Sequence, residues 1–150
     1  MKSFTGTGFG KVHVLRLDRG DYLLESVEAL IREQGIQNAV VVSAIGTFDY
    51  CAMHMVTTTG LPPVEHFERW EDEPLELSSM DGIIADGVPH FHMVVSDHLY
   101  AYSGHVEHGC RILYLGEIVI AEMEGLHFHR IRNRENIWEL NEKDSPCPPQ

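Results

Sequence analysis

The chain has 150 residues, which is enough for one domain whose core needs no disulfide or structural metal. Its formal net charge is −12 with histidines neutral, and protonating all ten histidines would still leave it negative. Because neutralisation of phosphates supplies most nucleic-acid affinity, this charge argues against direct binding of DNA or RNA.

The sequence also indicates where in the cell the protein is expected. No run approaches the roughly 18 apolar residues that a membrane span needs, and the first six residues lack the apolar centre of a secretory signal. We therefore expect a cytoplasmic protein without a membrane partner. Cys51, Cys110 and Cys147 are odd in number and lack Cys-x-x-Cys spacing, which argues against a disulfide framework or a thiolate zinc site.

The N-terminal part predicts a lead, a strand and a helix. Residues 1–10 are rich in glycine and precede a strand rather than follow one, so we expect a flexible lead and not a nucleotide-binding loop. Alternation over residues 12–17 predicts the strand. The helix is expected to begin at Asp21, a good N-cap, and to stop at Gly35, with apolar residues recurring at three and four between them.

The middle of the chain predicts strands that are broken by turns. Four strands are expected over residues 39–45, 50–59, 75–80 and 83–85. The polar connection 60–74 contains prolines and acids and is predicted to be a long loop.

The rest of the domain predicts further strands and a second, short helix. Strands are expected over residues 90–96, 101–108, 111–123 and 128–132, and a helical turn over 135–140. Residues 11–140 then form a single domain, and 141–150, with three prolines, form a disordered tail. The predicted fold is α/β of the α+β kind, with a mainly antiparallel β-sheet.

Three histidines form the strongest candidate for a functional site. His90 and His92 are two apart on a predicted strand, so both side chains point to the same face. If a hairpin pairs Ser96 with Ala101, His92 lies opposite His105, and paired side chains are roughly 5 Å apart at Cβ. Three neutral imidazoles suit zinc and leave a position open, although nickel, copper and cobalt also accept them.

Other histidines have no such register. His127 and His129 repeat the spacing, but they neighbour Arg130, and an exposed edge strand is the favoured interpretation. His54 and His66 could each approach the site, but the sequence does not place them. Among the acids, Glu117 could orient a histidine or act as a base, although a solvent-facing position is favoured. Glu65 is a second candidate base.

The chain resembles the PPC domain family, the "plants and prokaryotes conserved" domain also called DUF296, in its prokaryotic stand-alone form. The resemblance covers residues 11–125 and rests on a strand–helix–strand opening, on the Pro-His-x-His and Gly-His elements within 89–110, and on the segments 40–47, 75–82 and 103–106. It implies a homotrimer that carries zinc on three histidines, which correspond here to His90, His92 and His105.

The resemblance does not define an activity. Our first hypothesis is a trimeric zinc-binding module of undefined biochemical activity, with a pocket for a small ligand or partner; an enzymatic role is less favoured. One alternative is a zinc-dependent hydrolase or lyase that uses metal-bound water, with Glu117 or Glu65 as base. Another is a DNA-associated regulator that acts with a partner. Plant members carry AT-hook motifs, but this chain has no Arg-Gly-Arg-Pro hook.

Overall fold

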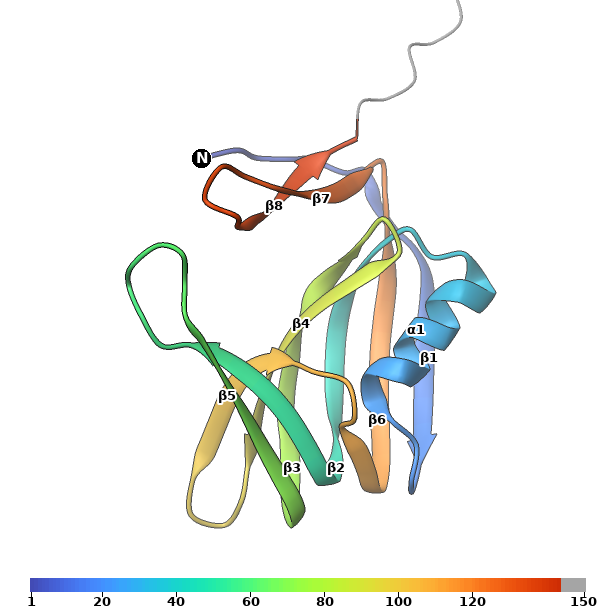
Figure 1. Ribbon diagram of the computed structural model, residues 1–150. Helices are drawn as coiled ribbons and strands as arrows, with labels where there is room; N and C mark the ends of the chain where they lie inside the picture. Colours follow the sequence, from blue (N-terminus) through green and yellow to red (C-terminus); the bar gives the residue numbers. More distant parts are fainter. Residues whose placement is uncertain (144–150) are drawn as a thin grey trace, which may run out of the picture.

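Strands dominate the part of the chain that the computed structural model describes, residues 1–143 (Figure 1). In chain order the elements are β1 (Gly8–Asp18), α1 (Leu23–Gln34), β2 (Asn38–Val56), β3 (Glu65–Ala85), β4 (Val88–Ser96), β5 (Ala101–Val106), β6 (Arg111–Glu124), β7 (Phe128–Arg132) and β8 (Trp138–Glu142). All pairings between these strands are antiparallel, which confirms the predicted fold class.

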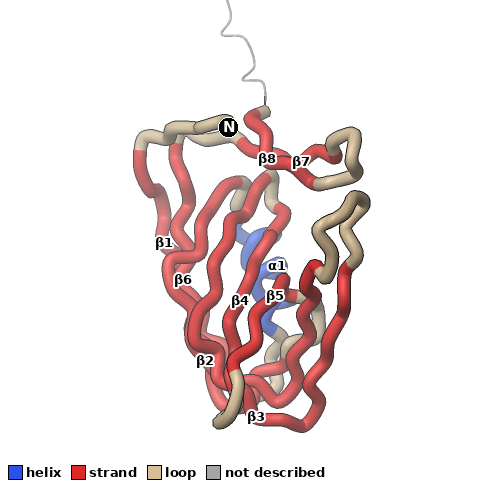
Figure 2. The backbone as a smooth tube through the Cα atoms, turned by 90° about the vertical axis from the view of Figure 1, so that its left-hand side faces the viewer, coloured by secondary structure: helices blue, strands red, loops and turns tan. Residues whose placement is uncertain are grey.

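The main sheet closes on itself at one end. Its strand order is β1-β6-β2-β3-β4-β5, and β2 also pairs with β5. Strands β2, β3, β4 and β5 therefore form a closed ring, whereas β1 and β6 extend it as an open sheet (Figures 1 and 2). β7 and β8 form a separate two-stranded sheet beside the N-terminal segment, where the ring of Phe4 packs on Phe128 at 5.3 Å between centroids.

The core lies between α1 and the sheet and continues into the ring. Leu23, Val27 and Ile31 on the inner face of α1 are buried. Phe48 and Phe91 are almost fully buried among the strands. Each such side chain contributes about 1.5–3 kcal/mol when it leaves water, so this burial outweighs the weak helix propensity of the β-branched residues.

The helix ends as predicted but begins differently. Gly35 adopts the left-handed conformation, with φ 69°, and its N–H donates to the Ile31 carbonyl. The N-cap is Tyr22, which makes no side-chain cap, because Asp21 Oδ2 instead accepts from the Asp18 N–H at 2.9 Å. Within residues 1–143, no helix is both long and apolar enough to cross a membrane.

Pairing joins segments that the sequence separates. The strands predicted over 39–45 and 50–59 are one strand, β2, because bulges on either side of Phe48 bend it without ending it. The loop predicted over 60–74 is wrong from residue 65 onward. There β3 pairs with the preceding strand β2 from Glu65↔Val56 to Glu71↔Tyr50, so hairpin pairing overrides the unfavourable acids and Pro74.

The end of the domain also differs from expectation. In place of the helical turn predicted over 135–140, residues 135–137 belong to the connection between β7 and β8, and residues 138–140 belong to β8, where Trp138 pairs with Arg132 of β7. Residues 8–10 of the predicted lead belong to β1, and residues 141–142 of the predicted tail belong to β8. Residues 144–150, with Cys147, lie outside the described residues.

Gly82 sets how closely β3 approaches β4 beside His90. A Cβ at Gly82 would overlap the His90 carbonyl oxygen and lie 2.9 Å from Phe91 Cα, and φ is 142°. We expect Gly82→Ala to lower the free energy of unfolding by about 2–3 kcal/mol, measured by urea denaturation. Gly60→Ala is the matched control, since a Cβ there meets nothing within 4 Å. Equal stability of the two variants would contradict this packing.

Candidate metal centre

The β4–β5 hairpin has the register that the sequence predicts. Ser96 pairs with Ala101, and His92 pairs with His105. Asp97 fixes the turn, since its Oδ1 accepts the N–H groups of Leu99 and Tyr100, each at 2.6 Å. A four-residue loop with this side-chain cap allows one register, so the two histidines face each other directly.

Four imidazoles meet where β2, β4 and β5 come together. His90, His92 and His105 are brought close to one another, and His54 of β2 joins them by pairing with His105. The ring centroids are 4.5 Å apart for His54–His105, 5.0 Å for His90–His105, 5.4 Å for His90–His92 and 5.5 Å for His92–His105. Sequence reasoning left His54 unplaced because its register depends on the closure of the ring.

Gly104 permits this closure. A Cβ on Gly104 would lie 2.7 Å from the His54 carbonyl oxygen and 3.2 Å from Met53 Cβ. Any larger residue would separate β5 from β2 and move His54 away from His105. The glycine that precedes His105 in the sequence therefore has a packing role at the site.

Glu107 connects two of the imidazoles and was missed in the sequence. Its Oε1 accepts from His54 Nδ1 at 2.6 Å and from His105 Nδ1 at 3.0 Å. A carboxylate is an acceptor only, so both Nδ1 atoms carry hydrogen and both Nε2 atoms keep a lone pair. A histidine with an acid two residues later on a paired strand is the sequence signal that could have identified this contact.

The cluster contains two overlapping groups of possible metal ligands. Within residues 1–143, His54, His105 and Glu107 form the group whose potential ligand atoms all lie within 4.8 Å of one another. The predicted trio, His90, His92 and His105, is more widely spaced, with ring centroids 5.0–5.5 Å apart. His105 belongs to both sets. Imidazole and carboxylate donors suit zinc and other divalent transition metals, so either set fits a metal chemically.

The surroundings of His90 and His105 favour the neutral form of these two imidazoles. Burial lowers the pKa of His90 to about 4, with further contributions from the positive charge of Arg130 and from the neighbouring histidines. Burial and His54 also lower the pKa of His105, although Glu107 opposes the shift. Neutral imidazole is the form that binds a metal, so these two donors are ready at neutral pH.

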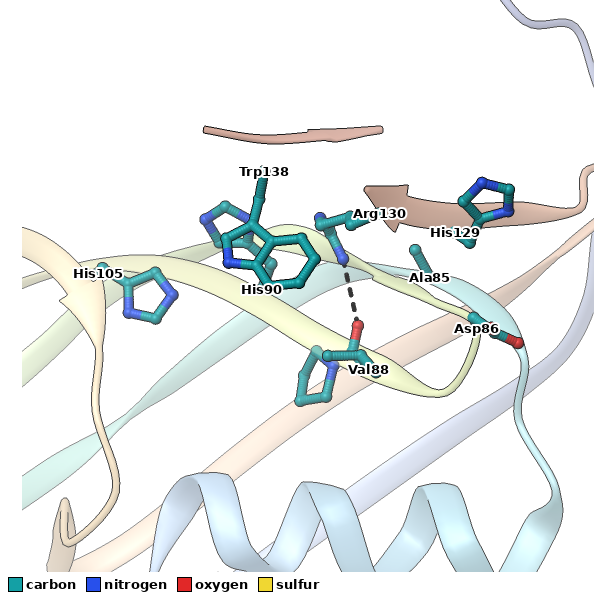
Figure 3. Close-up of a pocket in the computed structure, with 9 residues that line it drawn as sticks. Ala85, Asp86, Val88, His90, His105, His129, Arg130 and Trp138 are labelled. Atoms are coloured by element: carbon teal, nitrogen blue, oxygen red, sulfur yellow. Dashed lines mark hydrogen bonds between the residues drawn. The ribbon is translucent and has the colours of Figure 1, made fainter. Parts of the chain in front are cut away.

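A cavity of about 360 Å³ opens beside His90 and His105. The β7–β8 hairpin lies over it and contributes His129, Arg130 and Trp138 to its lining (Figure 3). The structure thus places His129, but not the exposed His127, at the edge of the site.

The candidate acids differ in their positions. Glu65 Oε1 is 3.9 Å from His54 Nε2, at the margin of the histidine cluster. Glu117 is exposed on β6 and pairs with Arg16 and Ile45, away from the paired segments that carry the histidines. His66 is also exposed and bonds with Glu68 at 3.1 Å.

Comparison with known proteins identifies the domain type. The sequence profile of the Plants and Prokaryotes Conserved (PCC) domain matches residues 5–124. "Bifunctional protein GlmU" from Synechococcus sp. (strain JA-2-3B'a(2-13)) is 30% identical over 121 residues, which are 80% of this chain. The chain spans only 18% of the length of that relative.

Solved structures share the whole fold. A plant- and prokaryote-conserved (PPC) protein from Pyrococcus horikoshii has a TM-score of 0.78 and 19% identity, covering 97% of this chain and 100% of its own. A metal-containing protein from Archaeoglobus fulgidus has a TM-score of 0.75 and 25% identity, covering 93% and 99%.

The electrostatics of His90 can be measured directly. In the metal-free protein we expect His90 to titrate near pH 4, well below its ordinary 6.5, in an NMR titration of the imidazole carbons. The unfolded chain then binds a proton that the folded chain does not, so stability should fall as pH drops from 6.5 to 4.

Charge variants test the cause of the shift. Arg130→Gln should raise the pKa of His90, because it removes a repulsive neighbour. Arg134→Gln makes the same charge change at an exposed position of the β7–β8 turn and should leave the titration unchanged. A wild-type His90 that titrates near 6.5 would contradict this description of the site.

Proposed function

Because this chain belongs to the Plants and Prokaryotes Conserved domain family, we propose that it is a metal-binding member of that family. Zinc is held by His90, His92 and His105, and the adjoining cavity takes a small ligand. The observation that carries the proposal is the convergence of neutral imidazoles from paired strands at the edge of a cavity.

The donor chemistry supports a transition metal with an open position. Three imidazole nitrogens match the preference of zinc, and three protein ligands leave the fourth tetrahedral position for water or a ligand. The Archaeoglobus fulgidus relative is described as metal-containing, which supports a metal in this fold. Zinc is favoured by the nitrogen-only set, although nickel, copper and cobalt compete for it.

Hydrogen bonding favours the trio over the set that contains Glu107. The Nδ1 atoms of His54 and His105 donate to Glu107, so neither can bind a metal on that side without losing this bond. With the trio, His105 binds through Nε2 while Glu107 stays as an outer carboxylate that fixes its tautomer. His54, stacked on His105 at 4.5 Å, then positions the ligand histidine.

We further propose that the chain assembles as a homotrimer. Strands β1 and β2 expose Val12, Val14, Val42 and Ile45, each between 49% and 71% accessible. The two strands belong to one sheet and are separated by β6. A group of exposed apolar residues on one sheet is typical of an interaction surface. Contact with further copies of the chain would bury these exposed apolar residues. The family resemblance is the reason for proposing three copies.

A zinc-dependent hydrolase is the second candidate. The position of Glu65, 3.9 Å from His54 Nε2, favours it, because a carboxylate at the margin of the cluster can act as a base toward metal-bound water. Direct DNA binding is not favoured, since a net charge of −12 repels phosphate. A regulatory role at DNA would require a basic partner.

Metal content tests the proposal. We expect purified protein to hold about one zinc ion per chain by elemental analysis, and His90→Ala, His92→Ala and His105→Ala each to weaken zinc binding severely. Glu107→Gln should retain zinc but bind it roughly 10- to 100-fold more weakly.

A matched control lies on the same hairpin. His98 is exposed in the β4–β5 turn, so His98→Ala should keep full metal content. Loss of zinc in His54→Ala together with its retention in His90→Ala and His92→Ala would overturn the trio in favour of the set with Glu107.

Light scattering after gel filtration tests the assembly. The wild type is expected to have about three times the chain mass of 17.0 kDa. Val14→Glu should dissociate the trimer, because it buries a charge at the interface. Leu99→Glu, in the exposed β4–β5 turn, should not. A monomeric wild type at micromolar concentration would contradict the proposal.

A further inference from the structure

Arg130 is a cation beside the histidines. Its hydrogen bonds within the protein leave some of its N–H donors unused. It is partly buried on β7, and its Nη1 and Nη2 donate to the carbonyls of Val88 at 3.3 Å and Ile83 at 3.4 Å. Both bonds are long, and a guanidinium has five N–H donors. These contacts hold the group at the cavity wall next to His90 (Figure 3).

The charge of Arg130 has no acidic partner among residues 1–143. The ion pairs of the described chain do not include it, and Asp86, the acid that lines the same cavity, pairs with Lys143. Burial lowers the pKa of Arg130, and no acidic neighbour opposes the shift. A partly buried cation without a counter-charge is costly, so this position at the cavity wall suits an anionic ligand.

The remaining cavity wall is mostly apolar. Trp138 lines one side of the cavity, and Ala85, Val88 and Pro89 contribute the other apolar part of its lining (Figure 3). The volume of about 360 Å³ lies within the range of small-molecule sites. The cavity therefore combines an apolar wall, a cation and metal-ligating side chains.

We propose that this cavity binds a small organic acid, with its carboxylate held by Arg130 and its apolar body packed against Trp138. A guanidinium matches the planar, two-oxygen geometry of a carboxylate better than that of any neutral group. Toward His90 and His105, the carboxylate also faces the coordination position that the three histidines would leave free on the metal. This contact with the metal is the one part of the proposal that rests on the proposed function. The metal adds positive charge where the neutral imidazoles supply none, so metal and arginine attract the same anion.

NMR can monitor the cavity with an internal control. Trp138 and Trp70 are the two tryptophans of the chain, and Trp70 is buried next to Tyr102, away from the cavity lining. Benzoate should therefore shift the indole N–H signal of Trp138 and leave that of Trp70 unchanged. Benzamide, its neutral counterpart, should bind at least about tenfold more weakly, since it lacks the charge-assisted hydrogen bonds.

Variants assign the carboxylate contact. Arg130→Gln should weaken benzoate binding at least about tenfold, whereas Arg134→Gln, with the same charge change on the same hairpin, should not. Arg130→Lys keeps the charge without the planar fork and should fall between them. Arg130 also bonds the β7–β8 hairpin to the main sheet, so the circular dichroism of each variant is compared with that of the wild type. If Arg130→Gln unfolds, Arg130→Lys replaces it as the test variant.

The titration is run on zinc-loaded and metal-free protein, and zinc content is measured separately. Benzoate should bind both, more tightly with zinc. An absence of zinc binding would overturn the metal centre. The dependence of benzoate binding on Arg130 would still be measured in the metal-free protein. Equal binding of benzamide, an unchanged affinity in folded Arg130 variants, or binding of inorganic phosphate without benzoate would overturn the organic-acid site.

Discussion

The closure of the sheet through β5 is the constraint on which the site depends. β5 pairs with β4 on one side and with β2 on the other, so His105 has His92 and His54 as direct cross-strand neighbours. Neither pairing alone would gather these rings. Closure requires the backbones to approach closely, and Gly104 permits this because a side chain there would meet the His54 carbonyl.

Closure also accounts for the chemistry of the cluster. Bringing imidazoles together at a partly buried position disfavours their protonated forms, which is why the pKa of His90 falls to about 4. Glu107 adds the opposite effect at His105, where it accepts the Nδ1 hydrogen and directs the lone pair away from itself. Desolvation, mutual repulsion and one acceptor carboxylate together leave neutral donors with fixed orientation, the state that a metal requires.

The charge distribution then makes the site distinctive within an acidic protein. A net charge of −12 disfavours anions over most of the surface. At the cavity an anion is favoured instead, because the positive charge of Arg130 has only carbonyl oxygens as partners among the described residues. The β7–β8 hairpin supplies both this charge and the Trp138 wall, so a small peripheral sheet completes a site whose histidines come from the main sheet.

Local rules predicted the part of the site that depends on one turn. The two-residue spacing of His90 and His92 and the short loop before Ala101 were enough to place His105, because a hairpin loop fixes register. His54, and with it the second contact of Glu107, was beyond such reasoning, because the register of His54 against β5 depends on the closure of the ring. Hairpin pairing with the end of β2 likewise turned the polar 60–74 segment largely into strand.

Metal coordination by His90, His92 and His105 is the central claim. Crystals of the zinc-loaded protein, with anomalous diffraction recorded on both sides of the zinc absorption edge, would locate the ion without reference to any sequence argument. We predict one peak with His90, His92 and His105 nitrogens at about 2.0–2.1 Å, with Glu107 bonded to the far side of His105. A peak between His54 Nδ1 and Glu107, or none near the histidines, would contradict the account.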